Sequence, residues 1–167
     1  MRWTKLKHKY KNEFLHESVR ARVDFHFDVY RKTHDQDGQV LRVSIDGETV
    51  FKGNKLLYML REHECSRQIK REAPELSWRE ASVLADQRLA KEAIHSRYHL
   101  TEAMREIMIL PIKAALQHED PIIRAFALLD KRVGRRRLEQ IQVTEDSHPL
   151  IRLFYQVRSA SRSKDTA

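Results

Sequence analysis

The hydrophobic pattern in the first third of the chain changes from the period of a helix to the period of a strand. Four apolar residues near the start recur at steps of three and four: Trp3, Leu6, Tyr10 and Phe14. This spacing predicts an amphipathic helix over residues 4–16, with Thr4 as its N-cap. Over residues 19–31 apolar and polar positions alternate, which predicts a strand with one buried and one solvated face.

Two turn signals divide the next stretch of alternating residues. Residues 33–38 read Thr-His-Asp-Gln-Asp-Gly, and Asp46-Gly47 is a two-residue hairpin signal. Alternation over residues 41–45 and 48–52 supplies a second and a third strand. The sequence therefore predicts a three-stranded antiparallel meander behind the N-terminal helix.

The rest of the chain carries helical signals. Asn54 is a candidate N-cap for a helix that ends before Pro74, and Ser77 with Glu80 forms a capping box for a helix that continues to about residue 96. Further helices are predicted from Thr101 and from the cap and first-turn proline at 120–121.

We therefore predict an α+β fold, in which an N-terminal helix and a three-stranded antiparallel meander precede a mainly helical C-terminal half. The predicted organisation is a helix and meander unit over 1–74 and a helical unit over 75–158, either as two domains or as one continuous domain. Residues 159–167 are expected to form a flexible tail.

One short pattern occurs twice near the C-terminal end. Residues 119–126 and 145–154 share acidic residues, a proline, two apolar residues, an arginine and a phenylalanine, and the two prolines are 28 residues apart. Two copies are too few for a solenoid. We expect two helices with similar first turns that pack against each other.

Composition narrows the class of protein. Of the 167 residues 41% are hydrophobic and 34% charged, which is too apolar for a disordered chain. No apolar run approaches the roughly 18 residues of a membrane span, and no apolar stretch follows the basic start, so neither a membrane helix nor a signal peptide is expected. The single cysteine, Cys65, excludes an internal disulfide and is compatible with the cytoplasmic location that we expect.

The net positive charge is concentrated in two short segments. Lys and Arg number 32 against 24 Asp and Glu. Ten of these bases lie in two segments without acids, residues 1–12 and 131–137, which leaves 22 bases against 24 acids elsewhere. Such clusters are typical of chains that contact phosphates, although they also serve as solvated surfaces that keep a protein in solution.

The leading hypothesis from the charge pattern is a non-catalytic protein that binds nucleic acid through phosphates. Little sequence preference is expected, because aromatic residues are not interleaved with the bases. Eight cations are predicted to make the contacts, the three consecutive arginines first: Arg135, Arg136, Arg137, Lys131, Arg132, Lys5, Lys9 and Lys11. The order of helix, three strands and helix is similar to that of double-stranded RNA-binding domains.

Two other classes of function stay open. The bases could meet an acidic protein partner while the helical half offers a docking face. A metal-dependent enzyme could use Asp24, His26 and Asp28, which share one face of the first predicted strand at intervals of about 6.5 to 7 Å. The alternation of a half-buried strand explains the same three residues, so we expect neither a metal nor another cofactor.

Other candidate motifs are weak. His95 and His99 are four residues apart and are expected to form a surface pair, and residues 35–38 match only part of a calcium loop and are expected to form a turn. The few glycines lie singly, which excludes a phosphate-binding P-loop.

Three groups of residues carry a resemblance to a known family. They are Trp3-Thr4-Lys5-Leu6-Lys7, the meander segments 30–35 and 45–48, and residues 124–138 followed by His148-Pro149-Leu150. Together they resemble a family of small uncharacterised bacterial proteins over nearly the whole chain. The resemblance implies a bacterial origin and assigns no catalytic residue.

Overall fold

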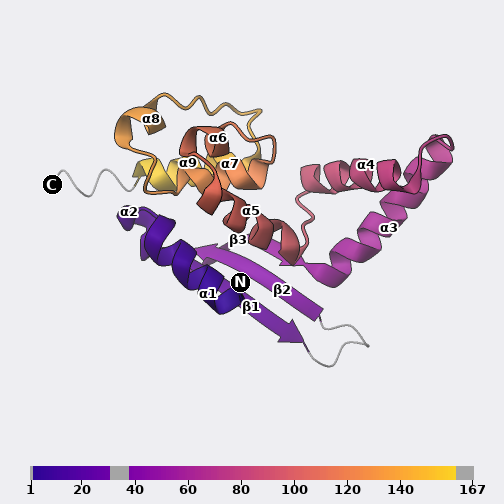
Figure 1. Ribbon diagram of the computed structural model, residues 1–167, viewed down its shortest axis with the longest axis horizontal. Helices are drawn as coiled ribbons and strands as arrows, with labels where there is room; N and C mark the ends of the chain where they lie inside the picture. Colours follow the sequence, from indigo (N-terminus) through magenta and orange to yellow (C-terminus); the bar gives the residue numbers. More distant parts are fainter. Residues whose placement is uncertain (1, 31–37, 161–167) are drawn as a thin grey trace. The chain divides into compact units, whose positions relative to one another are not determined.

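The structure of the protein, a computed structural model, describes residues 2–30 and 38–160 (Figure 1). It has the predicted α+β fold, with an N-terminal helix, a three-stranded antiparallel sheet and then helices. In chain order the elements are α1 (Trp3–Lys9), the π-helical segment η1 (Tyr10–Phe14), α2 (Glu17–Arg20), β1 (Val23–Tyr30), β2 (Gly38–Ile45), β3 (Glu48–Asn54), α3 (Lys55–Glu72), α4 (Trp78–Lys91), α5 (Arg97–Ile109), α6 (Ile112–Leu116), α7 (Pro121–Leu128), α8 (Arg135–Glu139) and α9 (Pro149–Ala160).

The first predicted strand begins four residues later than the alternation suggests. Residues 17–20 form the short helix α2 because the His16 ring caps it, with Nδ1 accepting a hydrogen bond from the Ser18 amide at 3.2 Å. Val19 is fully buried from this helical turn. A local cap therefore overrides a short run of alternating residues.

The sheet has the order β1-β2-β3, as a meander requires. At the turn between β2 and β3, Asp46 and Gly47 both have positive φ, 53° and 87°, as a two-residue hairpin turn demands. The turn predicted at residues 33–38 lies outside the described residues except for Gly38, which begins β2.

The chain divides into two compact units. Unit 1 comprises Met1–Phe25, Val43–Phe51 and Leu100–Ala167, and unit 2 comprises His26–Arg42 and Lys52–His99. The predicted boundary at residue 74 falls inside unit 2, between α3 and α4. Independent folding of 1–74 and 75–158 stays a prediction, and the tail predicted over 159–167 lies outside the described residues from 161 onward.

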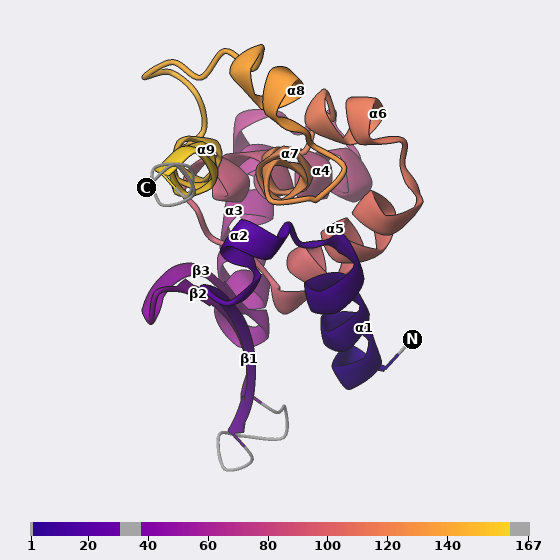
Figure 2. The same ribbon diagram turned by 90° about the vertical axis from the view of Figure 1, so that its left-hand side faces the viewer.

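The core of unit 1 is built around the ring of Phe126. Phe126 is fully buried, and the ring of Phe154 meets it edge to face with centroids 4.9 Å apart. Tyr10, Phe25 and Phe51 place their rings within 6.5 Å of the same ring. The helices α7 and α9, which begin with the repeated pattern, pack side by side as predicted (Figure 2).

Unit 2 contains a hairpin of two helices, α3 and α4 (Figure 1). The predicted caps are present, since Asn54 accepts from the Leu57 amide at 3.1 Å and Ser77 and Glu80 form the capping box. The hairpin buries a small core of Ile69, Ala81 and Ala85, while α3 and α4 expose several large apolar side chains: Leu57, Met59, Leu60, Trp78, Val83 and Leu84.

In unit 2, β3 is held against the segment that precedes α5. The Asn54 amide donates to the His95 carbonyl at 2.9 Å, and a Cβ built on Gly53 would lie 2.7 Å from the Ser96 carbonyl oxygen. Only glycine fits at position 53, because it has no Cβ to collide with the Ser96 backbone. Among the described residues, none of the helices is long and apolar enough to cross a membrane.

Candidate nucleic-acid interface

A backbone connection brings the end of the N-terminal helical segment against the start of the second basic segment. The His16 amide donates to the Leu129 carbonyl at 2.8 Å, and the Lys131 amide donates to the Phe14 carbonyl at 2.7 Å. Leu15 and Asp130 form an isolated antiparallel bridge between these two hydrogen bonds. Residues more than 110 positions apart in the sequence are thus fixed side by side within unit 1.

Arg132 is held by the interior of unit 1. It forms an ion pair with Asp130, with Nη2 and Oδ2 2.7 Å apart, and the Asp130 side chain is fully buried. The same guanidinium donates to the carbonyls of Ile107 and Leu110 at 2.7 and 2.9 Å, and it lies 5.2 Å from the centre of the Phe14 ring. The hydrogen bond to Asp130 raises the pKa of Arg132 further. Arg132 therefore serves the fold, although the charge pattern placed it among the phosphate contacts.

The three consecutive arginines occupy the first turn of α8. Arg135 pairs with Glu139 at 3.0 Å, a solvent-exposed pair four residues apart that stabilises little. Arg137 reaches the Arg132 carbonyl at 3.4 Å, and the structure gives Arg136 no ion pair with a described residue. Because α8 has only five residues, Arg136 and Arg137 also belong to its last turn, and the helix dipole gives no clear preference for or against these charges.

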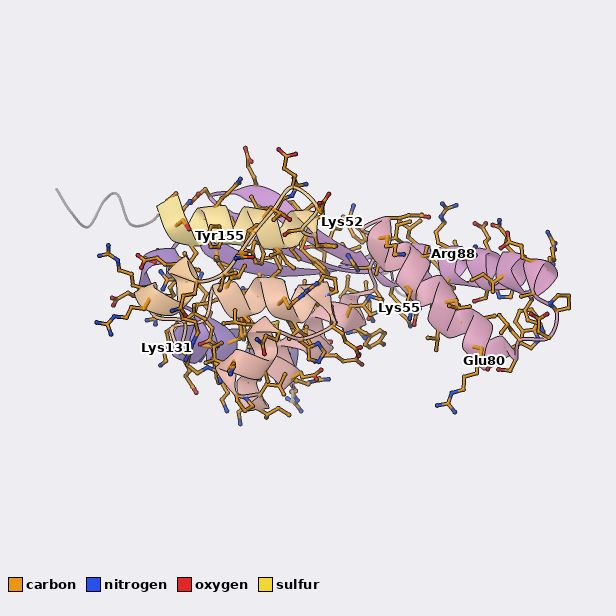
Figure 3. The ribbon with its side chains drawn as sticks, turned by 90° about the horizontal axis from the view of Figure 1, so that it is seen from above. Lys52, Lys55, Glu80, Arg88, Lys131 and Tyr155 are labelled. Atoms are coloured by element: carbon orange, nitrogen blue, oxygen red, sulfur yellow. The ribbon has the colours of Figure 1, made fainter. Side chains whose placement is uncertain are left out.

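Lys131 is exposed at the point where the two segments meet. Figure 3 labels it beside the N-terminal helical segment, in agreement with its backbone bond to Phe14. Within the described ranges its ammonium makes no ion pair, in contrast to Arg132 directly after it. Of the predicted cations in residues 131–137, Lys131 and Arg136 are thus the two most available for contact with an anion.

The lysines of the N-terminal segment differ in their surroundings. Lys11 forms an ion pair with Asp24 at 2.6 Å, which neutralises it locally. Lys5 is exposed and Lys9 is half-buried on α1, nine and five residues before the backbone connection begins at Phe14. The connection therefore brings the C-terminal end of this segment, rather than Lys5, close to Lys131.

Sequence reasoning missed one cation of this region, Arg20 of α2. Its Nη2 donates to the Leu15 carbonyl at 3.1 Å, which places the guanidinium next to the residue that bridges to Asp130. The predicted strand concealed it, because an alternating pattern gives Arg20 an ordinary solvated position. The cap at His16 was the signal that could have revealed the helical turn.

The cations of α2, of residue 131 and of α8 that form no ion pair with a described residue are called here the basic surface: the half-buried Arg20 and the exposed Lys131, Arg136 and Arg137. The carboxylates of Glu13 and Glu17 are exposed on the same stretch of η1 and α2. Four cations against two acids leave a net positive surface of modest strength.

Two of the three candidate metal ligands form ion pairs with cations. Asp24 pairs with Lys11, and Asp28 accepts from Arg42 Nη2 at 2.7 Å. His26 is exposed on β1. Across residues 2–30 and 38–160, no three histidine, cysteine or acidic side chains gather as a metal-binding group.

The predicted surface pair of histidines is wrong. His95 is only 5% exposed, and its ring meets that of His99 with centroids 5.9 Å apart. The reason is that α4 ends at Lys91, and residue 95 then lies in the segment that pairs with β3. His99 in turn contacts the ring of Tyr58, whose hydroxyl donates to Asp86, and burial together with this hydrogen bond raises the pKa of Tyr58.

The fold defines the class: an α+β protein with a three-stranded antiparallel sheet that is followed mostly by helices. The chain belongs to the SF0329 protein family, whose profile matches residues 2–159. The predicted membership of an uncharacterised family is thereby confirmed. No curated protein and no solved structure matches the chain.

Proposed function

We propose that the protein binds nucleic acid through its phosphates, with unit 1 supplying the contacts. The observation that carries the proposal is the basic surface, where the connection between residues 14–16 and 129–131 gathers cations from two distant parts of the sequence. Arginine and lysine neutralise phosphates on any scaffold.

Low sequence preference follows from the chemistry of the surface. Phosphate contacts position a protein on a strand, whereas base edges carry the sequence information. The basic surface offers cations on short helices and a connecting segment, without an aromatic ring or an amide side chain among its four members. We therefore infer backbone recognition by a protein that performs no reaction.

Binding at two salt concentrations tests the proposal. Each phosphate contact contributes about −0.9 to the slope of log affinity against log salt for duplex DNA, and about −0.7 for single strands. Four contacts give a slope of about −3.6, so affinity for a labelled duplex of about 20 base pairs should fall about 100-fold between about 50 and 200 mM salt. A flat response, or no binding at the lower concentration, would contradict the proposal.

A second candidate function, a protein-interaction module, is favoured by a different observation. The α3–α4 hairpin leaves Leu57 and Leu60 of α3 and Val83 of α4 at least half exposed. Contiguous exposed apolar side chains commonly mark protein contacts. A photo-cross-linking residue at position 60 and another at position 136 discriminate the two functions in cells, since protein adducts from 60 favour the module and nucleic-acid adducts from 136 favour phosphate binding.

A further inference from the structure

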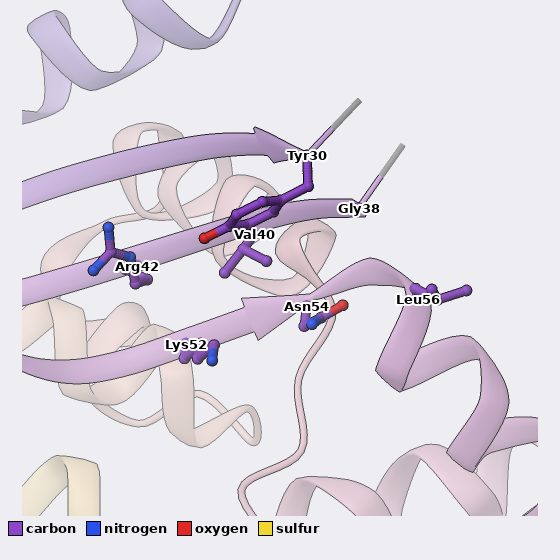
Figure 4. Close-up of a pocket in the computed structure, with 7 residues that line it drawn as sticks. All are labelled: Tyr30, Gly38, Val40, Arg42, Lys52, Asn54 and Leu56. Carbon is purple, nitrogen blue, oxygen red and sulfur yellow. The ribbon is translucent and has the colours of Figure 1, made fainter. Parts of the chain in front are cut away.

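Unit 2 carries a hollow on one face of its part of the sheet. Its volume is about 450 Å³ (Figure 4). All three strands contribute side chains, and the start of α3 closes one end. The lining residues are Tyr30, Gly38, Val40, Arg42, Lys52, Asn54 and Leu56.

One wall of the hollow is an aromatic ring. Tyr30 is 57% exposed, and Figure 4 shows its ring lying across β2 above Val40, with the hydroxyl toward Arg42. Val40 is only 6% exposed beneath it. The ring therefore presents a flat, accessible surface over an apolar floor, which is the arrangement on which another planar ring stacks.

The opposite wall carries positive charge. Arg42 donates through Nε and Nη2 to Asp28 at 2.9 and 2.7 Å, so this pair contributes little net charge. Lys52 of β3 is exposed, and no described residue forms an ion pair with it. The backbone of β3 lies two strand spacings, roughly 10 Å, from that of β1, so the hollow extends across the sheet between Tyr30 and Lys52.

We propose that this hollow binds one unpaired nucleotide, with the base stacked on Tyr30 and the phosphate at Lys52. The volume lies in the lower part of the range for small-molecule sites, about 300 to 1,000 Å³, and suits a single nucleotide. Stacking is available to every base, so no particular base is favoured. The site lies in the other unit and does not rest on the phosphate contacts of unit 1.

Amide and ring resonances of the full chain, followed by NMR, test the site with three probes: adenosine monophosphate, adenosine and inorganic phosphate. Adenosine monophosphate at about 5 mM should shift the Gly38 and Val40 amides and bind more tightly than either of the other two. Tyr30→Leu should weaken this binding about fivefold or more, while Tyr30→Phe should retain it. Lys52→Gln should weaken the binding of adenosine monophosphate and leave that of adenosine unchanged.

Tyr98→Leu is the matched control, because Tyr98 is also an exposed tyrosine of unit 2 and lies outside the hollow. A five-nucleotide single strand distinguishes the two sources of a nucleotide: tighter binding than adenosine monophosphate indicates a strand, and equal binding indicates a free nucleotide. Shifts elsewhere, no shifts, or binding that Tyr30→Leu and Tyr30→Phe affect equally would overturn the site. If unit 1 failed to bind duplex DNA, the expected binding of adenosine monophosphate in the hollow would not change. The two proposals can therefore be refuted independently.

Discussion

Arg132→Met should destabilise the protein strongly, whereas Lys131→Met next to it should not. The Met side chain replaces the aliphatic stem of the arginine and removes its guanidinium. Asp130 then stays fully buried with its nearest cation gone, and the carbonyls of Ile107 and Leu110 lose the donors at 2.7 and 2.9 Å.

The magnitude follows from the burial of Asp130. Removing one partner of a buried pair costs about 3 to 5 kcal/mol, because the other charge is left without compensation. The Arg132 side chain keeps 30% of its surface exposed, so water can reach part of the site and the expected cost is about 2 to 4 kcal/mol. Lys131→Met changes an exposed side chain and should stay within about 0.5 kcal/mol of the parent.

Urea unfolding followed by circular dichroism measures both variants. Adding Asp130→Asn to Arg132→Met removes the buried charge and should recover about 1 to 3 kcal/mol of the loss. A cost below about 1 kcal/mol for Arg132→Met, or no recovery in the double variant, would refute the structural role assigned to this arginine.

Three further predictions concern stability. Phe126→Ala removes the ring that four other aromatic side chains contact and should cost about 3 to 5 kcal/mol in urea unfolding, and a loss below about 1 kcal/mol would contradict the central position of this ring. Gly53→Ala should destabilise unit 2 by about 1 to 3 kcal/mol in urea unfolding, since its Cβ would meet the Ser96 backbone, whereas Gly134→Ala has open space and should be nearly neutral in the same experiment. Burial raises the pKa of Tyr10 well above 10.0, so the neutral Tyr10 hydroxyl stabilises the fold fully below pH 10.0, and this stabilisation is lost as the pH rises further. Tyr10→Phe should therefore flatten the decline of the melting temperature at alkaline pH. An unchanged decline would contradict burial of the Tyr10 hydroxyl as its cause.

Local signals in the sequence were sufficient for much of the fold. The cap at Asp120, the first-turn Pro121 and the capping box at Ser77 act within one helical turn, so they are visible without tertiary information. The hairpin turn at Asp46-Gly47 is equally local. The repeated first-turn pattern is also local, and it identified the first turns of α7 and α9. These two helices pack together.

The site required information that no local pattern carries. Arg132 looked like its neighbours in the sequence, and only the burial of Asp130 separates it from Lys131. The position of the Arg20 side chain depends on whether residues 17–20 form a helix or a strand, and the His16 cap decides for the helix. The hollow beside Tyr30 joins residues from three strands whose polar positions each resembled an ordinary solvated face.

The most direct test of phosphate binding by the basic surface is the salt slope of duplex binding in two matched variants. Lys131→Gln, Arg136→Gln and Arg137→Gln together remove three of its four cations and should bring a slope of about −3.6 to about −0.9. Arg67→Gln, Arg71→Gln and Arg79→Gln remove the same charge from exposed positions of unit 2 and should leave the slope unchanged. Equal slopes in the two folded triple variants would contradict the account, because the contacts would then follow net charge alone or lie on another surface.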